Sequence, residues 1–596
     1  MTELQEVVLS YPKLKDRIDS RDNSKAEKER ALKCLKEIAA DFSPTYIKSM
    51  EKMLDAALPR LYDGINFNEG DVNLEELTKQ GSVVLVPNHQ SHADYLAINY
   101  QVFKKYGFPV YIAGGINLNI FPIGTMFRKS GCFFIRRSFS NDITYKLTLE
   151  AYLYYLLKEK KPIEFFFEGG RSRTGKLLPP RYGLYQMLIE AHNVLSDQGE
   201  KTPLIFLPVS IVHEYVPEQK SLARELSGGK KKKESTGQLF GLFKLFAYQF
   251  GSVHINLGKP IDMVKEPAEE LKKQTQNLAF KCFREVGRNM MVTPTSLLAL
   301  VLLDEPQGAL LWSDIIAKAK AVITHCKKFD IPVTSSLDCE NFEAALGRAM
   351  DILVGNKKIE LIGRNDGTSH PFYSIKEESR TEILYFKNTI LHHFLVPWVI
   401  TGAWINMFNG RINTVEDLKS FFLAQRAQLK QEFYLPTVHE FFLKTLKVIS
   451  DCIGREVKSL EDCLELSRKE LYAIVANLGV FSRVCSTINE AYYGAMVAMK
   501  ELHSKNPQGF KYDTYTKKMK ETLDELRNLG RVVKYKESFS IAIAKSSMTY
   551  FQQMGVIDNI DGLYTIVEHD KFALLLKKYE NDLIDKLALN IRVVES

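Results

Sequence analysis

Short apolar runs alternate with helical segments between residues 81 and 261, and this alternation limits the fold more than any other feature. The apolar runs have the length of strands and are rich in β-branched and aromatic residues. Helical patterns, such as those of residues 145–158 and 181–195, separate them. Strands that alternate with helices predict an α/β domain with a mixed sheet and covering helices.

The flanking regions differ from this central part. Residues up to about 62 show helical periodicity rich in lysine and glutamate, and the chain after residue 266 is largely helical. We therefore predict a helical N-terminal region over 1–80, an α/β catalytic domain over 81–290 and a mostly helical C-terminal domain over 291–596. The apolar content of 45% is sufficient for a substantial core.

Charge and cysteine usage narrow the class of partner. The net charge of +8 favours anionic partners, but it is small against 80 basic and 72 acidic residues, so no nucleic acid is expected.

The eight cysteines include no Cys-x-x-Cys pair, which favours a reducing compartment and no metal site. The first thirty residues mix acids and bases without the apolar core of a targeting peptide.

The longest stretch without a charged side chain lies between Lys387 and Arg411. It is nominally long enough to cross a bilayer, but histidines, a proline and an asparagine interrupt it. These interruptions favour a buried or interfacial helix over a spanning one. In the interfacial case Trp398 and Trp404 would suit a headgroup boundary.

A histidine and an aspartate follow the apolar run of residues 82–87. If Ser91 caps the next helix, Asp94 falls in its first turn and can reach back to the ring of His89, fixing its tautomer. Such a pair is a general base without a nucleophile of its own. No Gly-x-Ser-x-Gly motif occurs, so the attacking hydroxyl is expected to belong to the substrate.

Two further apolar runs end in cations. Residues 131–137 end in Arg136 and Arg137, and residues 165–176 (FFFEGGRSRTGK) pass from an apolar strand into two glycines and then three cations. Glycines let a backbone approach an anion closely, and guanidinium groups bind phosphate oxygens in pairs. Together with His89, the two loops predict a site for a phosphorylated alcohol. The alternative is that these cations only solvate the strand ends.

At these residues the chain resembles the glycerol 3-phosphate acyltransferases of the large bacterial membrane-associated type. The four acyltransferase blocks of that family appear in order, at residues 89–94, 131–137, 167–176 and 207–211. Residues 385–391 and 429–433 match it more loosely. One departure is Gln90, where the family usually has arginine, which removes one cation from the first block.

The resemblance implies transfer of an acyl group from an acyl thioester to the sn-1 hydroxyl of glycerol 3-phosphate. The product is 1-acyl-glycerol 3-phosphate (lysophosphatidic acid), the first intermediate of phospholipid biosynthesis. The donor would be acyl-CoA or an acyl carrier protein thioester, with no other cofactor. The implied location is the cytoplasmic face of the bacterial inner membrane, in a peripheral or monotopic attachment to the lipid surface.

The resemblance also assigns roles to residues. His89 and Asp94 would be catalytic, and Pro208 and Val209 would line the acyl channel. The remaining positions would bind substrate: Arg136, Arg137, Glu168, Gly169, Gly170, Arg171, Ser172, Arg173 and Lys176.

Alternative functions remain open. Dihydroxyacetone phosphate acyltransferases share the blocks, but typically have Gly-Thr in place of Gly169 and Gly170. A nucleotide-binding P-loop at 170–176 fails because Leu177 stands where a Ser or Thr should bind magnesium. A non-catalytic membrane-associated scaffold is a third possibility, against which the intact His89 and Asp94 speak.

Two other segments have weaker functional interpretations. The lysine run at residues 230–233 is a solvated loop, or a contact for anionic lipid or an acidic carrier protein. Residues 544–566 have the outline of a helix and wing, as in some nucleic-acid binders. That segment lacks a basic recognition face, so interior packing is favoured for it.

Overall fold

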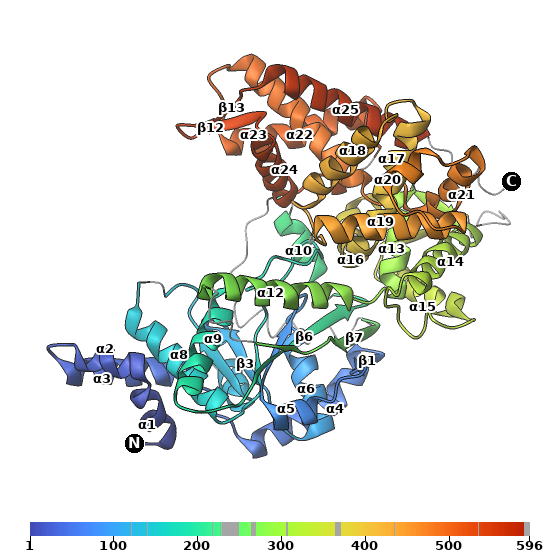
Figure 1. Cartoon of the computed structure of the whole chain (residues 1–596). Coiled ribbons are helices and arrows are strands. Elements are labelled where there is room, and N and C mark those ends of the chain that lie inside the picture. The colour runs from blue at the N-terminus through green and yellow to red at the C-terminus, as the bar shows by residue number, and fades with distance from the viewer. Residues whose placement is uncertain are drawn as a thin grey trace. The chain divides into compact units, whose positions relative to one another are not determined.

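The chain forms two compact units (Figure 1). The first consists of Met1–Ser172, Leu177–Pro217 and Lys232–Met291, and the second of Arg173–Lys176, Glu218–Lys231 and Val292–Ser596. The computed structural model describes residues 1–120, 122–139, 141–216, 218–226, 228, 250–263, 270–305, 308–363, 371–433, 435–533 and 536–588. The lysine run at 230–233 lies outside these residues.

A mixed sheet of eight strands forms the centre of the first unit. Its order is β1-β7-β6-β2-β5-β3-β4, and β8 pairs with β6. Strands β6, β2, β5, β3 and β4 are parallel neighbours, whereas β7 and β8 run antiparallel to β6. The strands are β1 (Gly64–Asn68), β2 (Ser82–Pro87), β3 (Tyr111–Gly115), β4 (Cys132–Ile135), β5 (Ile163–Glu164), β6 (Leu204–His213), β7 (Ser252–Leu257) and β8 (Ile261–Asp262).

Helices cover both faces of this sheet (Figure 1), which confirms the predicted α/β fold class. Strands β2 and β6 are buried at every position, as expected for parallel strands covered on both sides. The helices between β1 and the end of the unit, together with one 3-10 turn, are α5 (Leu74–Gln80), α6 (Asp94–Tyr106), η1 (Ile116–Leu118), α7 (Ile123–Lys129), α8 (Ile143–Lys158), α9 (Gly183–Asp197) and α12 (Leu271–Arg288).

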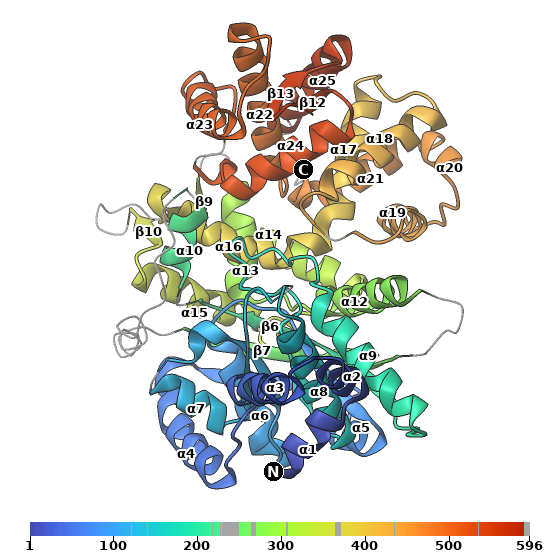
Figure 2. The same ribbon diagram turned by 90° about the vertical axis from the view of Figure 1, so that its left-hand side faces the viewer.

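Three N-terminal helices pack on α8, as Figure 2 shows for α1 (Glu3–Ser10), α2 (Pro12–Asp19) and α3 (Ser24–Ile38). The next helix, α4 (Pro44–Leu61), contacts α6 instead. The side chain of Glu150 on α8 is buried and accepts hydrogen bonds from the hydroxyl of Tyr11 and from Lys13 Nζ. The same ammonium group lies 2.8 Å from Glu190 on α9. The helical N-terminal region is therefore fastened to the sheet domain by buried polar contacts.

The second unit is mostly helical. Its helices are α10 (Gln219–Leu226), α13 (Pro294–Asp304), α14 (Trp312–Lys328), α15 (Phe342–Gly355), α16 (Arg380–Ile390), α17 (Leu395–Phe408), α18 (Val415–Leu429), α19 (Val438–Ile453), α20 (Leu460–Leu464), α21 (Arg468–Leu478), α22 (Ser486–Lys505), α23 (Tyr512–Asn528), α24 (Ile541–Gln553) and α25 (His569–Ala588). Its 3-10 turns are η3 (Glu377–Ser379), η4 (Leu391–Phe394), η5 (Gly479–Phe481) and η6 (Lys536–Ser538).

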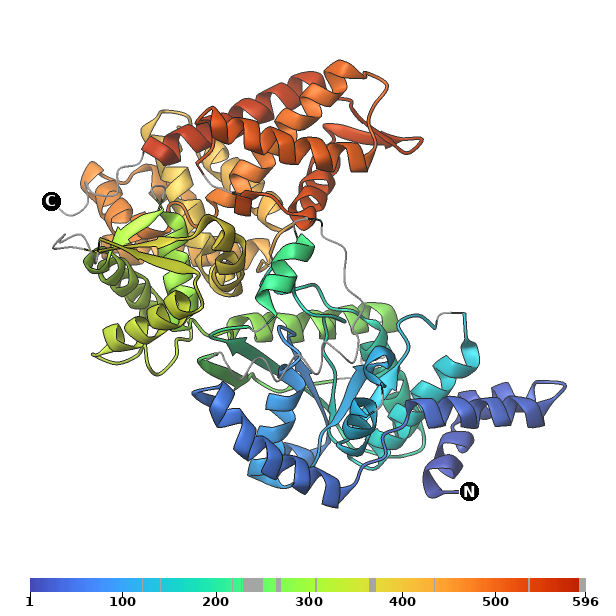
Figure 3. The ribbon, with the colours of Figure 1, turned by 180° about the vertical axis from the view of Figure 1, so that it is seen from behind.

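Two small antiparallel sheets complete the second unit, with orders β10-β11-β9 and β12-β13. Their strands are β9 (Ala309–Leu311), β10 (Ile359–Ile362), β11 (Phe372–Ile375), β12 (Ile557–Ile560) and β13 (Leu563–Ile566). The hairpin β12-β13 lies beside the helices drawn in orange and red in Figure 3, and it contacts α22 and α24. The predicted helix and wing are thus α24 and this hairpin, which is buried only at its base, at Ile557 and Ile566, and is exposed at its turn.

The long apolar segment of the second unit is a core element. Among the described residues, Glu377–Phe408 is one helical stretch long and apolar enough to cross a membrane, and a bent pair formed by Arg468–Phe481 and Ser486–Lys505 could count as a second. However, 78% of the apolar window in Glu377–Phe408 is buried. Trp398 and Trp404 are buried too, which favours the buried helix over the interfacial one, the two alternatives that the sequence left open.

A buried ion pair joins α16 to the turn η6 in this unit. Arg380 Nε and Nη2 lie 2.7 and 2.6 Å from Glu537 Oε1, and both side chains are almost fully buried. We predict that Arg380→Met lowers the free energy of unfolding of the second unit by about 3–5 kcal/mol, because the Glu537 carboxylate would stay buried without its partner.

All three tryptophans of the chain, Trp312, Trp398 and Trp404, lie in this unit, so tryptophan fluorescence during urea unfolding measures the effect. The double variant Arg380→Met/Glu537→Leu should recover most of the loss, because no buried charge remains. A single variant as stable as the wild type would contradict the prediction.

Candidate active site

The histidine and aspartate of the first block lie between β2 and α6. His89 follows the end of β2, and Asp94 is the first residue of α6. The Nδ1 atom of His89 is 2.8 Å from Oδ2 of Asp94. The expected cap at Ser91 is wrong: the cap residue is Ala93, and the Ser91 hydroxyl accepts the Ala93 N–H instead. Asp94 nevertheless reaches back to the ring as predicted from its place in the first turn.

Asp94 is fully buried and accepts four hydrogen bonds. Besides His89, the donors are the N–H groups of Gln90 and Ser91, at 2.6 and 2.9 Å, and Nε2 of His213 at 2.6 Å. Burial by itself would raise the pKa of Asp94, but the hydrogen bonds from His213 and His89 lower it below its ordinary value. The carboxylate therefore stays ionised inside the protein.

His213 was not predicted from the sequence. It is the last residue of β6, two positions beyond the fourth block, and lies past the segment Leu204–Val209 that pairs with β2. The sequence signal that could have identified it is a histidine at the end of an otherwise apolar strand. Without knowledge that β6 neighbours β2, nothing in the sequence connects His213 to Asp94.

The ring of His89 is mostly enclosed. Its side chain is 13% exposed and stacks on Phe166, with ring centroids 4.1 Å apart. Because Asp94 accepts a hydrogen bond from Nδ1, the proton is assigned to that nitrogen, and Nε2 remains as the basic atom. This arrangement can remove a proton from a hydroxyl that lies against Nε2.

The glycine-rich loop after β5 is held against the same histidine. The Ser172 N–H donates to the carbonyl of His89 at 2.9 Å, and Glu168 accepts the N–H groups of His89 and Leu178 at 3.3 and 3.0 Å. Burial raises the pKa of Glu168 well above its ordinary value. In this arrangement Glu168 braces the loop backbone, whereas the exposed Gly169 and Gly170 form its open side.

The cations of this loop belong to both units. Arg171 is half-buried in the first unit, whereas Arg173 and Lys176 belong to the second. Within the second unit, Arg173 pairs with Glu225 at 2.8 Å, and Lys176 pairs with Glu432. Two of the three predicted phosphate-binding cations are therefore paired with carboxylates in this structure.

The second unit holds the tip of the loop by its backbone as well. Asn388 Nδ2 donates to the carbonyl of Thr174 at 2.8 Å, and Gly175 has a positive φ of 82°. A side chain at Gly175 would lie 2.1 Å from the carbonyl oxygen of Tyr385. The loosely matching segments 385–391 and 429–433 thus supply the residues that contact residues 174–176.

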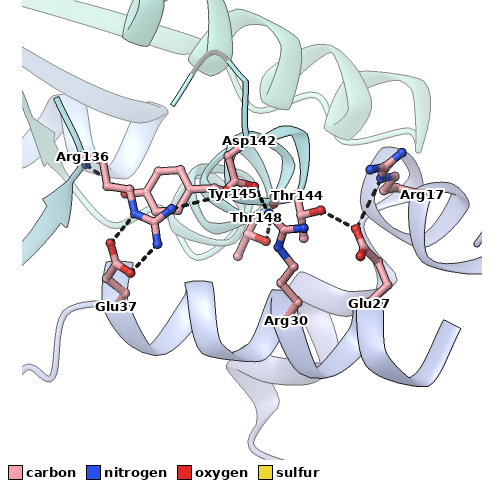
Figure 4. Close-up of polar contacts among 9 residues, drawn as sticks. All are labelled: Arg17, Glu27, Arg30, Glu37, Arg136, Asp142, Thr144, Tyr145 and Thr148. Carbon is pink, nitrogen blue, oxygen red and sulfur yellow. Dashed lines mark hydrogen bonds and ion pairs between the residues drawn. The ribbon is translucent and has the colours of Figure 1, made fainter. Parts of the chain in front are cut away.

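Two carboxylates of the first unit bind the guanidinium group of Arg136 (Figure 4). Its Nε and Nη2 each lie 2.7 Å from an oxygen of Glu37 on α3, and Nη1 lies 3.0 Å from Asp142 at the start of α8. Its guanidinium also stacks on the ring of Tyr145, 4.2 Å from the centroid. The Glu37 carboxylate raises the pKa of Arg136 above its ordinary value.

The sheet topology sets the distance between Arg136 and His89. Both follow parallel strands and lie at the same edge of the sheet, but β5 and β3 separate β4 from β2. At roughly 4.8 Å per strand, the two strand ends are about 14 Å apart. The neighbouring Arg137 is exposed and forms no ion pair with the described residues.

Pro208 and Val209 lie within the buried strand β6, opposite Val86 and Pro87 of β2. Val209 accepts the N–H of Asn88 through its carbonyl, at 3.4 Å. Both residues support the strand end that carries His89. Among the described residues, no group of three histidine, cysteine or carboxylate side chains could hold a metal ion.

Comparison with known proteins agrees with this site. Residues 71–212, which contain the His89–Asp94 pair and most of the parallel strands, match the family model described as "Acyltransferase". The first unit thus carries an acyltransferase domain.

Residues 222–560 match the model described as "Glycerol-3-phosphate acyltransferase C-terminal region". Because this match covers more than half of the chain, the chain belongs to the glycerol-3-phosphate acyltransferase family, which confirms the predicted family.

Curated relatives carry the same family name. The chain is 30% identical over 471 residues to the glycerol-3-phosphate acyltransferase of Pseudoalteromonas translucida, covering 75% of this chain and 55% of the relative. It is 32% identical over 422 residues to that of Shewanella loihica, covering 67% of this chain and 51% of the relative. The chain therefore spans about half the length of the curated relatives it matches.

Replacement of Asp94 tests the hydrogen-bond network. An amide has only one acceptor oxygen, so Asp94→Asn must turn its NH₂ group toward some of the four donors. Losing one charge-assisted hydrogen bond costs about 1.5–3 kcal/mol, so amide hydrogen exchange in residues 84–98 should become at least about tenfold faster.

Hydrogen exchange measured by mass spectrometry checks this prediction. The peptide of residues 145–158 in α8 is the internal control and should not change. Unaltered exchange in residues 84–98 would show that Asp94 does not hold the turn.

Proposed function

We propose that this chain transfers an acyl group from an acyl thioester to the sn-1 hydroxyl of glycerol 3-phosphate. The contact of 2.8 Å between His89 Nδ1 and Asp94 Oδ2 carries the proposal, because it leaves Nε2 as a base at the open edge of the sheet. Membership of the glycerol-3-phosphate acyltransferase family supports the choice of acceptor. The relatives of Pseudoalteromonas translucida and Shewanella loihica, both named glycerol-3-phosphate acyltransferase, support it as well.

In the proposed reaction, Nε2 of His89 removes the proton of the acceptor hydroxyl as its oxygen attacks the thioester carbonyl. The buried charge of Asp94 stabilises the imidazolium that forms. The tetrahedral intermediate collapses, its carbon–sulfur bond breaks, and the thiolate that leaves takes the proton from the imidazolium. No acyl-enzyme forms, because the nucleophile belongs to the substrate.

We assign the phosphate of the acceptor to the arginines of the two cationic loops in the first unit. Arg171 lies in the loop that is bonded to His89, directly before Ser172, and Arg137 is exposed at the end of β4. Arg136 has five N–H donors, of which three contact Glu37 and Asp142. Its remaining donors can bind a phosphate oxygen only beside the Glu37 carboxylate, which would repel the anion.

The donor and the location are assigned from the family. We propose acyl-CoA or acyl carrier protein as donor, with no further cofactor, and a peripheral or monotopic position on the cytoplasmic face of the inner membrane. The bacterial relatives support this placement. The apolar segment Glu377–Phe408 adds no support, because 78% of its apolar window is buried inside the second unit.

Replacement of His89 tests the reaction. We predict that His89→Gln lowers kcat by roughly 10²–10⁴-fold, because the variant loses its general base, while glycerol 3-phosphate still binds. The assay offers glycerol 3-phosphate and dihydroxyacetone phosphate in parallel, each with acyl-CoA and acyl carrier protein thioesters, and identifies the ester formed.

The matched control is His192→Gln on α9, whose Nε2 lies 2.8 Å from the carbonyl oxygen of Thr202. It should retain wild-type turnover. Turnover by His89→Gln at the wild-type rate would show that this histidine is not the general base. A product formed only from dihydroxyacetone phosphate would show that this compound, and not glycerol 3-phosphate, is the acceptor.

Replacement of Glu37 tests the role of Arg136. We predict that Glu37→Gln lowers KM for glycerol 3-phosphate, because the competing carboxylate is removed from the guanidinium. A part-exposed ion pair is worth up to about 1 kcal/mol, which corresponds to a change in KM of up to about fivefold.

Glu27→Gln is the control for this variant. Glu27 lies on the same helix α3 and contacts Thr144 and Arg17, but not Arg136 (Figure 4). The KM of Glu27→Gln for glycerol 3-phosphate should equal that of the wild type. A raised KM in Glu37→Gln would instead mean that Glu37 holds Arg136 in place for the phosphate.

A further inference from the structure

Asp94 is shared between two histidines. Its Oδ2 atom accepts from His89 and from two backbone N–H groups, whereas the partner of Oδ1 is Nε2 of His213, at 2.6 Å. The side chains of Asp94 and His213 are both 0% exposed. One histidine thus faces the edge of the sheet, and the other holds the far side of the same carboxylate.

The strand pairing of β2 and β6 places His213 there. The side-chain amide of Asn88 bonds to Ile211 in both directions, at 3.0 and 2.8 Å, and Oε1 of Gln90 accepts the N–H of His213 at 3.3 Å. These bonds fix the end of β6 against the turn that carries His89. The neutral side chain of Gln90 fills a position next to His213 that is 1% exposed.

The hydrogen bonds assign the protonation state of His213. Its Nδ1 atom is buried and has no hydrogen-bond partner among the described residues. A proton on that nitrogen would be a buried donor without an acceptor, so the ring is neutral and carries its proton on Nε2. His213 therefore donates an N–H to the Asp94 carboxylate.

The other groups that face Asp94 do not supply such a donor. Glu164 on β5 is fully buried, and neither of its oxygens has a hydrogen-bond partner in the described part of the chain. Burial, and then the charge of Asp94, raise the pKa of Glu164, and burial likewise raises that of Glu168. On its other side, the ring of His213 meets the ring of Tyr62, with centroids 6.3 Å apart.

We propose that His213 is a positioning residue of the acyl-transfer site, which orients the Asp94 carboxylate toward His89 and takes up part of its negative charge. The proposal rests on the proposed function, because it concerns the same histidine–aspartate pair. By stabilising the charge on Asp94, His213 limits how strongly the pair binds its first proton, and so sets the pH at which His89 becomes a base.

The direction of the effect follows from this role. Without a donor on Oδ1, the Asp94 carboxylate is more basic, so the pair takes up its first proton at a higher pH. His213→Phe should raise the apparent pKa of His89 by about one unit, the size expected when a charge-assisted hydrogen bond is lost. His213→Gln, which retains an N–H donor, should raise it by less than about half as much.

The test is an NMR titration of the whole chain labelled in its histidine rings. The signal of His89 is assigned as the one missing from His89→Gln. The matched control is His254→Phe on the neighbouring strand β7, since His254 is also buried but contacts Glu214 and Asn66. That variant should leave the midpoint of His89 unchanged. The acid limb of the kcat/KM profile should move with the midpoint measured by NMR.

The outcomes separate this proposal from the proposed function. An unmoved His89 midpoint in folded His213→Phe, or an equal shift in His254→Phe, overturns the positioning role. A specific shift without any acylation of glycerol 3-phosphate by the wild type supports the positioning role and overturns the proposed function instead.

A second measurement needs no substitution at residue 213. The wild-type chain should show a far-downfield imidazole N–H resonance for His213, and Asp94→Asn should abolish it. Absence of that resonance in the wild type overturns the proposal even if His213→Phe does not fold.

Discussion

The carboxylate of Asp94 is the group on which the arrangement of this site depends. A fully buried charge is tolerated only when hydrogen bonds replace its lost hydration, and here two backbone N–H groups and two imidazoles do so. The backbone donors require the tight turn after β2, and the second imidazole requires β6 beside β2. Asp94 thus receives hydrogen bonds both from the turn next to it in sequence and from a neighbouring strand. The same carboxylate orients the ring of His89.

Three cations of the predicted phosphate-binding loops are paired with the chain's own carboxylates. In the first unit Glu37 and Asp142 engage Arg136, and in the second unit Glu225 engages Arg173 and Glu432 engages Lys176. Guanidinium groups bind carboxylate and phosphate with the same paired geometry, so an internal carboxylate can occupy the place of a substrate phosphate. An arginine in a motif therefore indicates that an anion can bind. Only the folded structure shows that this anion is a carboxylate of the protein itself.

Sequence patterns predicted the parts that depend on local chemistry. The apolar runs at β2 and β6 became buried strands, and the helix expected at residues 145–158 is α8 (Ile143–Lys158). The strand expected at residues 165–167 was wrong, because β5 ends at Glu164 and these residues already belong to the loop. The spacing of His89 and Asp94 placed them in contact because only one turn separates them. The cap at Ser91 was wrong, because Ala93 caps the helix instead. The choice between a buried and an interfacial helix around Trp398 and Trp404 could be made only from the packing of the second unit.

By itself, the sequence determined the α/β class, the order of the four blocks, the family and the pair formed by His89 and Asp94. Only the tertiary structure decided that His213 completes the environment of Asp94, that Glu37 holds Arg136, and that residues 174–176 rest on segments more than two hundred positions away. The physical reason is distance along the chain. Hydrogen bonds and ion pairs act over a few ångströms, and only the strand order and helix packing bring such remote partners within that range.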